Sequence, residues 1–108
     1  MEDKRRFPRV PLNRRLLCAL DNVNSTEAPA RDFSAGGVSF YPAFAYPLNA
    51  RVLISMSLKQ GSHTIALQGR VVRVWKENGK DCCAVEFVDV SPERARELTE
   101  FVETLPDE

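Results

Sequence analysis

The sequence contains a single histidine, His63, and only three cysteines, so it is poor in the residues that most catalytic and metal sites use. Cys18, Cys82 and Cys83 do not have the spacing of metal ligands, and an odd number of cysteines argues against a disulfide framework. His63 falls in a predicted strand beside no obvious Ser, Cys or Asp partner, and no phosphate-cradling glycine motif is present. We therefore predict that the protein is not an enzyme and has no catalytic residues, no metal site and no cofactor.

The sequence also lacks an excess of charge of either sign and any long apolar run. Its 15 basic and 15 acidic residues give a formal net charge of zero, unlike a polybasic binder of nucleic acid or of a membrane surface. No apolar run approaches the roughly twenty residues that span a bilayer, and the first ten residues are too charged for a signal peptide. We expect one cytoplasmic domain of 108 residues without membrane contact.

Positive charge is concentrated at the N-terminus. Six basic residues against two acidic ones give the first fifteen residues a net charge of +4. Two prolines discourage a helix, so residues 1–12 are predicted to form a flexible basic arm. Arg5 and Arg9 are four apart in this arm, and each guanidinium can hold a phosphate or the O6/N7 edge of guanine with two hydrogen bonds.

Residues 13–90 repeat a pattern of short strands separated by turn residues. Pro29 cannot donate to a strand ladder, which predicts an edge or a bulge at that point. The apolar phase changes near 69–72, which predicts a bulge or a barrel corner, and the Asn-Gly pair within 76–80 is the strongest hairpin signal in the chain. The predicted strands span 10–21, 26–32, 38–41, 51–58, 63–75 and 82–88.

The chain closes with a predicted amphipathic helix over residues 91–105. Ser91 suits the N-cap, Pro92 suits the first helical position, and apolar residues then recur at helical spacing. Short antiparallel strands followed by one helix indicate a mainly all-β fold. We predict a six-stranded antiparallel β-barrel over residues 13–90 with one C-terminal α-helix, and an open sheet is the alternative.

The stretch from Asp32 to Gly37 combines small polar residues with two glycines. Such residues form ordinary tight turns between strands. They also suit a recognition surface, because Asp32 offers two acceptor oxygens, Ser34 offers a hydroxyl, and the glycines leave room for close approach. Asp32 can accept the N1–H and N2–H donors of a guanine whose opposite edge faces an arginine. The arm and this stretch together suit a guanine nucleotide with more than one phosphate.

These two motifs, in this order, resemble those of the PilZ domain, the bacterial receptor module for cyclic di-GMP. An Arg-x-x-x-Arg motif in an N-terminal arm is followed there by (Asp/Asn)-x-Ser-x-x-Gly on a barrel. The segments at 69–74 and 84–87 and the closing helix are also similar to the family. The first motif stands here as Arg5-Arg6-Phe7-Pro8-Arg9 and the second as Asp32-Phe33-Ser34-Ala35-Gly36-Gly37.

The resemblance implies a dinucleotide held between arm and barrel, without catalysis. The resemblance implies that Arg5 and Arg9 contact guanine and phosphate. It also implies that Asp32 and Ser34 contact the guanine edge and neighbouring groups. Lys4 adds charge that favours an intercalated pair of ligands over a single one, and Trp75 either stacks on a base or is a half-buried strand residue. The predicted contacts are Arg5, Arg6, Arg9, Asp32, Ser34, Gly36 and Gly37, with Lys4 and Trp75 as auxiliary positions.

The resemblance thus implies a cyclic di-GMP receptor or adaptor that passes its signal to an unidentified protein effector, as a monomer or weak dimer. Two alternatives remain. A PilZ-fold interaction module without ligand binding would use the helix or Phe44 and Tyr46, which otherwise cover one end of the core. A small barrel that binds single-stranded nucleic acid would need a row of exposed aromatic residues, which the strands do not show.

Overall fold

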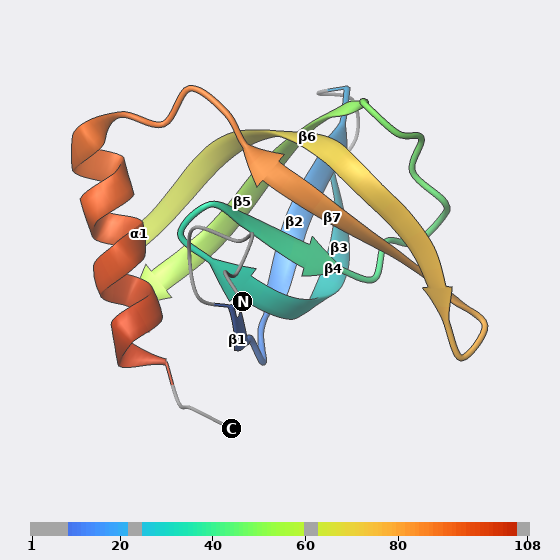
Figure 1. The fold of residues 1–108 in the computed structure, drawn as a ribbon, viewed down its shortest axis with the longest axis horizontal. Coiled ribbons are helices and arrows are strands. Elements are labelled where there is room, and N and C mark those ends of the chain that lie inside the picture. The colour runs from blue at the N-terminus through green and yellow to red at the C-terminus, as the bar shows by residue number, and fades with distance from the viewer. Residues whose placement is uncertain (1–8, 22–24, 60–62, 106–108) are drawn as a thin grey trace, which may run out of the picture.

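The computed structural model describes residues 9–21, 25–59 and 63–105, and within them the chain forms seven strands and one helix (Figure 1). Every strand pair is antiparallel. The elements are β1 (Val10–Pro11), β2 (Arg15–Leu20), β3 (Ser25–Ser34), β4 (Gly37–Phe40), β5 (Arg51–Lys59), β6 (His63–Glu77), β7 (Lys80–Phe87) and α1 (Pro92–Thr104).

Six of these strands close into a barrel. Their order is β3, β2, β5, β6, β7 and β4, and β4 pairs back with β3. Within the barrel the ten-residue strand β3 pairs with β2 up to Pro29 and with β4 from Ala30 onward. A bulge between Ala30 and Asp32 bends the strand where the partner changes. The predicted barrel is confirmed, Pro29 lies beside a bulge, and the open-sheet alternative is wrong.

The sheet begins earlier than the predicted boundary between arm and barrel. β1 pairs with β3 and places Pro11 opposite Asp32. Val10 packs against the core and Leu12 is buried. Burial of these apolar side chains is favourable, and it brings the end of the predicted arm into the fold. Residues 1–8 lie outside the described part of the chain.

β6 and β7 form a long hairpin that projects beyond the barrel (Figure 1). Its turn has Asn78 at φ 50° and Gly79 at φ 82°, both in the left-handed region that this type of hairpin turn requires. The register between the two strands shifts between Val71 and Arg73. Both the predicted turn and the predicted bulge near 69–72 are therefore confirmed.

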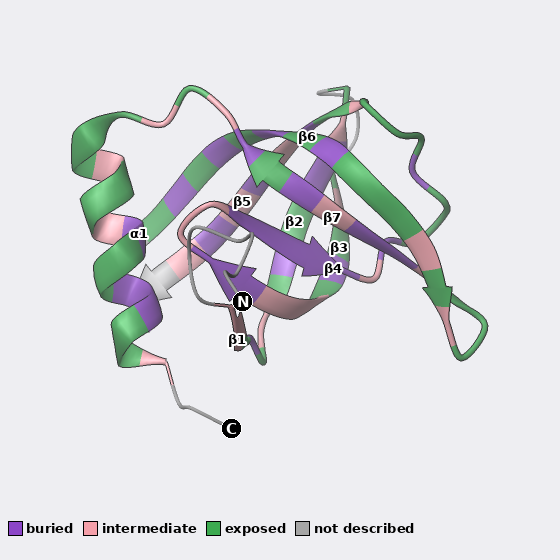
Figure 2. Ribbon diagram, in the orientation of Figure 1, coloured by how far each residue is buried: buried purple, intermediate pink, exposed green. Residues whose placement is uncertain are grey.

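The apolar core fills the barrel, and α1 covers one end of it (Figure 2). The ring of Phe101 on α1 meets Phe33 on β3 edge-on, with centroids 5.4 Å apart. Leu98 and Val102 are buried on the same helix. At the helix start, the hydroxyl of Ser91 accepts a hydrogen bond from the backbone N–H of the third helical residue, at 3.1 Å. The predicted cap and helix are confirmed.

The connection between β4 and β5 carries Phe44 and Tyr46, the two aromatic residues considered above as a docking patch. Tyr46 is only 3% exposed, and its ring lies 5.8 Å from that of Phe40. Phe44 is 48% exposed and its ring lies 5.2 Å from that of Tyr46. Tyr46 therefore covers the core, whereas a docking role for Phe44 stays a prediction.

Candidate ligand-binding site

The Asp32 motif spans the end of β3 and the turn into β4. Asp32 and Ser34 are strand residues, and only Ala35 and Gly36 form the turn before β4 begins at Gly37. Ser34 is buried; its hydroxyl accepts from the N–H of Gly36 at 3.2 Å and donates to the carbonyl of Gly37 at 3.4 Å. The motif is therefore a tight turn, stabilised by the serine, with the aspartate on the strand that leads into it.

Gly37 is glycine because two strands of the barrel approach each other closely. A Cβ atom there would lie 2.3 Å from the carbonyl oxygen of Val85 on β7. Neither Gly36 nor Gly37 has a positive φ, and Gly79 is the only described glycine that does. The neighbouring strand thus occupies the space that a side chain of Gly37 would need. Ligand contacts of both glycines remain predictions.

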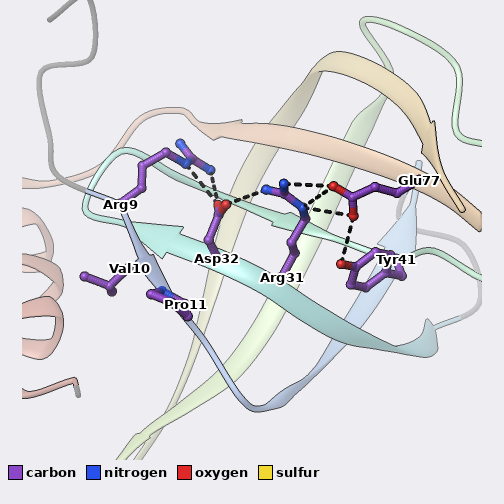
Figure 3. A pocket seen from close by; sticks show the side chains of 7 residues that line it. All are labelled: Arg9, Val10, Pro11, Arg31, Asp32, Tyr41 and Glu77. Atoms are coloured by element: carbon purple, nitrogen blue, oxygen red, sulfur yellow. Dashed lines mark hydrogen bonds and ion pairs between the residues drawn. The ribbon is translucent and has the colours of Figure 1, made fainter. Parts of the chain in front are cut away.

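Asp32 is the centre of a polar cluster on the outer face of the barrel (Figure 3). Its Oδ1 accepts from Arg9 Nε at 3.0 Å and Nη2 at 2.8 Å, and also from the hydroxyl of Ser39 at 2.7 Å. Its Oδ2 accepts from Arg31 Nη1 at 2.7 Å. One residue of each sequence motif, Arg9 and Asp32, is therefore brought into direct contact across 23 residues of chain.

A second acidic residue, Glu77 at the end of β6, extends this cluster. Arg31 donates to it from Nε at 3.1 and 3.2 Å and from Nη2 at 2.9 Å. The hydroxyl of Tyr41 donates to Glu77 Oε1 at 3.0 Å. Four charges consequently alternate along the surface in the order Glu77, Arg31, Asp32, Arg9, as the dashed lines of Figure 3 show.

The electrostatics of the Glu77 end follow from these hydrogen bonds. The pKa of Glu77 is lowered, first by the hydrogen bond from Arg31 and then by that from Tyr41. The pKa of Arg31 is raised, chiefly by its hydrogen bond to Glu77. The pKa of Tyr41 is raised by burial and then by Glu77. Both members of the ion pair are therefore held in their charged forms.

Two open cavities adjoin the contact between Arg31 and Asp32. One, of about 500 Å³, also reaches Tyr41 and Glu77. The other, of about 340 Å³, is lined as well by Ser39, Val72, Arg73, Trp75 and Ala84. Arg9 lines both cavities.

Trp75 is a partly buried strand residue whose ring faces two guanidinium groups. The guanidinium carbon of Arg73 lies 4.5 Å from the ring centroid, and that of Arg31 lies 5.6 Å from it. The interpretation of Trp75 as a half-buried strand aromatic is confirmed, and its stacking on a base stays a prediction.

Sequence reasoning missed Arg31, Ser39, Tyr41, Arg73 and Glu77. Arg73, Trp75 and Glu77 occupy every second position of β6, so strand periodicity could have grouped them on one face. No local pattern pairs Arg31 with Glu77, which are 46 residues apart. That contact depends on how the projecting hairpin lies relative to β3.

The family model described as PilZ domain matches residues 3–104. The chain belongs to the PilZ domain family. No curated protein matches the sequence.

Solved structures share the fold of this PilZ domain. The PilZ domain of YcgR from Escherichia coli, described with c-di-GMP, has a TM-score of 0.75 and 20% identity, covering 95% of this chain and 92% of that one. YcgR from Escherichia coli in complex with c-di-GMP has a TM-score of 0.75 and 17% identity, and the match covers 94% of this chain and 45% of that one. The inhibitor of motility MotI from Bacillus subtilis has a TM-score of 0.72 and 14% identity, and the match covers 93% of this chain and 50% of that one. The chain spans about half the length of the last two.

The described part of this PilZ domain brings together only some of the predicted ligand contacts. Arg9 and Asp32 touch, with Trp75 on the same surface, whereas Lys4, Arg5 and Arg6 lie outside the described residues. Across the described ranges, no group of three or more His, Cys, Asp and Glu side chains is arranged to hold a metal ion. The one described helix is too short and too polar to cross a membrane.

Proposed function

We propose that this PilZ domain is a receptor for cyclic di-GMP, which it holds between its N-terminal arginines and the outer face around Asp32. The observation that carries this proposal is the direct contact of Arg9 with Asp32, because it unites the two sequence motifs at one place. The fold neighbours from Escherichia coli are described with this ligand. A protein effector then reads the ligand-bound surface.

The chemistry of the cluster suits this ligand. Cyclic di-GMP carries two guanines and two anionic phosphodiesters. A carboxylate accepts from the N1–H and N2–H edge of guanine, and arginines hold phosphates or the O6/N7 edge with paired hydrogen bonds. Asp32 supplies the carboxylate, and Arg9 supplies a guanidinium beside it. Arg5 and Arg6 of the arm would complete the clamp, with Trp75 as a stacking surface.

Binding requires the existing contacts of Asp32 to be exchanged. Oδ1 already accepts two hydrogen bonds from Arg9 and one from Ser39. A guanine edge can reach this oxygen only if Arg9 moves from it to another part of the ligand. Closing the arm over the ligand costs about 1–2 kcal/mol for each residue that becomes ordered, and each hydrogen bond to a charged group returns about 1.5–3 kcal/mol. Several such bonds must form together.

Isothermal titration calorimetry with cyclic di-GMP tests the proposal, with a linear guanine dinucleotide and a single-guanine nucleotide as competing ligands. We expect the cyclic ligand to bind most tightly. Arg9→Ala and Asp32→Ala should each weaken binding at least about tenfold, a loss of about 1.4 kcal/mol.

Arg51→Ala is the matched control for loss of one positive charge. Arg51 is exposed on β5 and lines a different cavity, with Asn49 and Asp89. This variant should bind like the unaltered chain. Equal affinities of the Arg9 and Asp32 variants and the unaltered chain would exclude the proposed site.

A further inference from the structure

Arg31 belongs to neither sequence motif, yet its guanidinium occupies the middle of the candidate site. It contacts Asp32 on one side and Glu77 on the other, and it lines both cavities. Its side chain is 36% exposed, so a ligand can reach it. The same guanidinium lies 5.6 Å from the centre of the Trp75 ring. Any nucleotide that reaches both Asp32 and Trp75 therefore passes Arg31.

The hydrogen-bond donors of Arg31 are only partly used. Its Nε and one hydrogen of Nη2 point to Glu77, and one hydrogen of Nη1 points to Asp32. A guanidinium carries two hydrogens on each terminal nitrogen, so one hydrogen on Nη1 and one on Nη2 have no acceptor among the described residues. Two donors on neighbouring nitrogens suit the oxygens of a phosphate.

Glu77 and Tyr41 hold this guanidinium in place. The carboxylate of Glu77 takes the Nε and Nη2 edge of Arg31, and the hydroxyl of Tyr41 fixes Glu77 in turn. The lowered pKa of Glu77 and the raised pKa of Arg31 agree with a stable ion pair. A donor fixed before the ligand arrives loses less conformational entropy on binding than a free side chain does.

The charges of the ligand also bear on which cations meet its phosphates. Within the larger cavity, the positive charges of Arg9 and Arg31 are matched by Asp32 and Glu77. A ligand with two phosphodiesters brings two negative charges into this neutral group. Arg5 and Arg6 of the arm would bring further positive charge, and Arg31 can donate to a phosphate from its present position through its unused Nη1 and Nη2 hydrogens.

We propose that Arg31 is a phosphodiester-binding residue of this site and that Glu77 is its positioning residue. The inference rests on the proposed function, because it names a further contact for the same dinucleotide. The alternative is that Glu77 competes with the phosphate for Arg31. In that case, removal of the Glu77 side chain would tighten ligand binding. The two arrangements thus differ in the sign of the effect of one substitution.

Calorimetric titration with cyclic di-GMP of the full chain and four variants tests the proposal. Arg31→Ala should weaken binding by about tenfold, as loss of a charge-assisted pair of hydrogen bonds implies. Glu77→Ala should weaken it by about threefold to tenfold, because Arg31 becomes free to move. The double variant should bind no more weakly than Arg31→Ala alone, since a positioning residue has no effect once its partner is gone. Arg51→Ala, with the same loss of charge elsewhere on the barrel, should bind like the unaltered chain.

Arg31→Lys keeps the proposal testable if the alanine variant does not fold. It retains the positive charge but not the planar fork, so it should bind at least about threefold more weakly than the unaltered chain. Thermal unfolding of every variant, followed by circular dichroism, identifies those that are folded.

Three results would overturn the inference while leaving the proposed function intact: unchanged affinity of folded Arg31 variants, tighter binding by Glu77→Ala, or an undiminished effect of Glu77→Ala in the Arg31→Ala background. Absence of binding by the unaltered chain would instead overturn the proposed function, and this inference with it.

Discussion

Asp32 receives four hydrogen bonds from three side chains. Only Arg31 is on the same strand as Asp32, and the other two donors come from other segments of the chain. The carboxylate is 19% exposed, so these donors replace much of the water that a free aspartate would bind. Ser39 is almost fully buried, and its hydroxyl is satisfied by donating to Asp32. Asp32 therefore sits in a fully formed cluster of paired charges.

At the residue scale, the contribution of Glu77 to stability should depend on pH. Its pKa lies below the ordinary value of 4.5 in the folded chain, so its contribution is complete above 4.5 and is lost as pH falls through the lowered value. Glu77→Gln should therefore unfold at lower urea concentration than the unaltered chain at about pH 7, and at nearly the same concentration at about pH 2. A difference of equal size at both pH values would contradict this assignment, because glutamine mimics the protonated acid.

At the scale of elements, the barrel is closed by the shortest of its six strands. β4 has only four residues, yet it pairs with β3 on one edge and with β7 on the other. All four are buried, which leaves no room for larger side chains. The turn that holds the Asp32 motif leads directly into this strand, so the geometry of the motif depends on how closely β4 approaches β7.

Gly37→Ala should consequently destabilise the fold. Its Cβ would meet the backbone of β7 at 2.3 Å, and backbone cannot move aside as a flexible side chain can. We expect a loss of about 1–3 kcal/mol in the free energy of unfolding, measured by urea denaturation. Gln68→Ala, at an exposed position on β6, should change it by less than about 0.5 kcal/mol. Equal stability of Gly37→Ala and Gln68→Ala would show that β4 and β7 can separate without cost.

Across the whole molecule, the three cysteines report on the closure of the barrel. Cys18 on β2 and Cys83 on β7 belong to the core, and Cys82 is buried outside it, with its sulfur 3.8 Å from Glu77. Neighbouring residues of a strand point to opposite faces, which is why Cys83 enters the core and Cys82 does not. Cys82 is buried nevertheless, and its sulfur contacts Glu77 and the carbonyl of Lys80.

Thiol labelling of the native chain should therefore be slow. Burial raises the pKa of Cys18 and of Cys83 to about 12, so little thiolate exists at about pH 8. Mass spectrometry after treatment with iodoacetamide should find the native protein essentially unmodified, and all three cysteines modified in urea. Rapid native labelling of Cys18 or Cys83 would mean that the barrel opens far more often than its packing implies.

The sequence alone was enough to predict the barrel, its closing helix and the two motifs. Alternation of apolar residues predicts the strands and which of their side chains face the core. The Asn-Gly pair predicts a hairpin, and the phase change in β6 predicts its bulge. Each of these signals lies within a few residues of the feature it predicts. Family membership confirms the resemblance that the motifs suggested. The two motifs also nominated Arg9 and Asp32 as members of one site.

Only the tertiary structure decided which other side chains share that site. The register of β4 against β3 brings Ser39 to Asp32, and the projecting hairpin carries Glu77 to Arg31. The contact between Arg31 and Glu77, which are 46 residues apart, depends on barrel closure and strand curvature, and that between Ser39 and Asp32 depends on the bulge that sets the register. These are properties of the packed whole, and no short stretch of sequence encodes them.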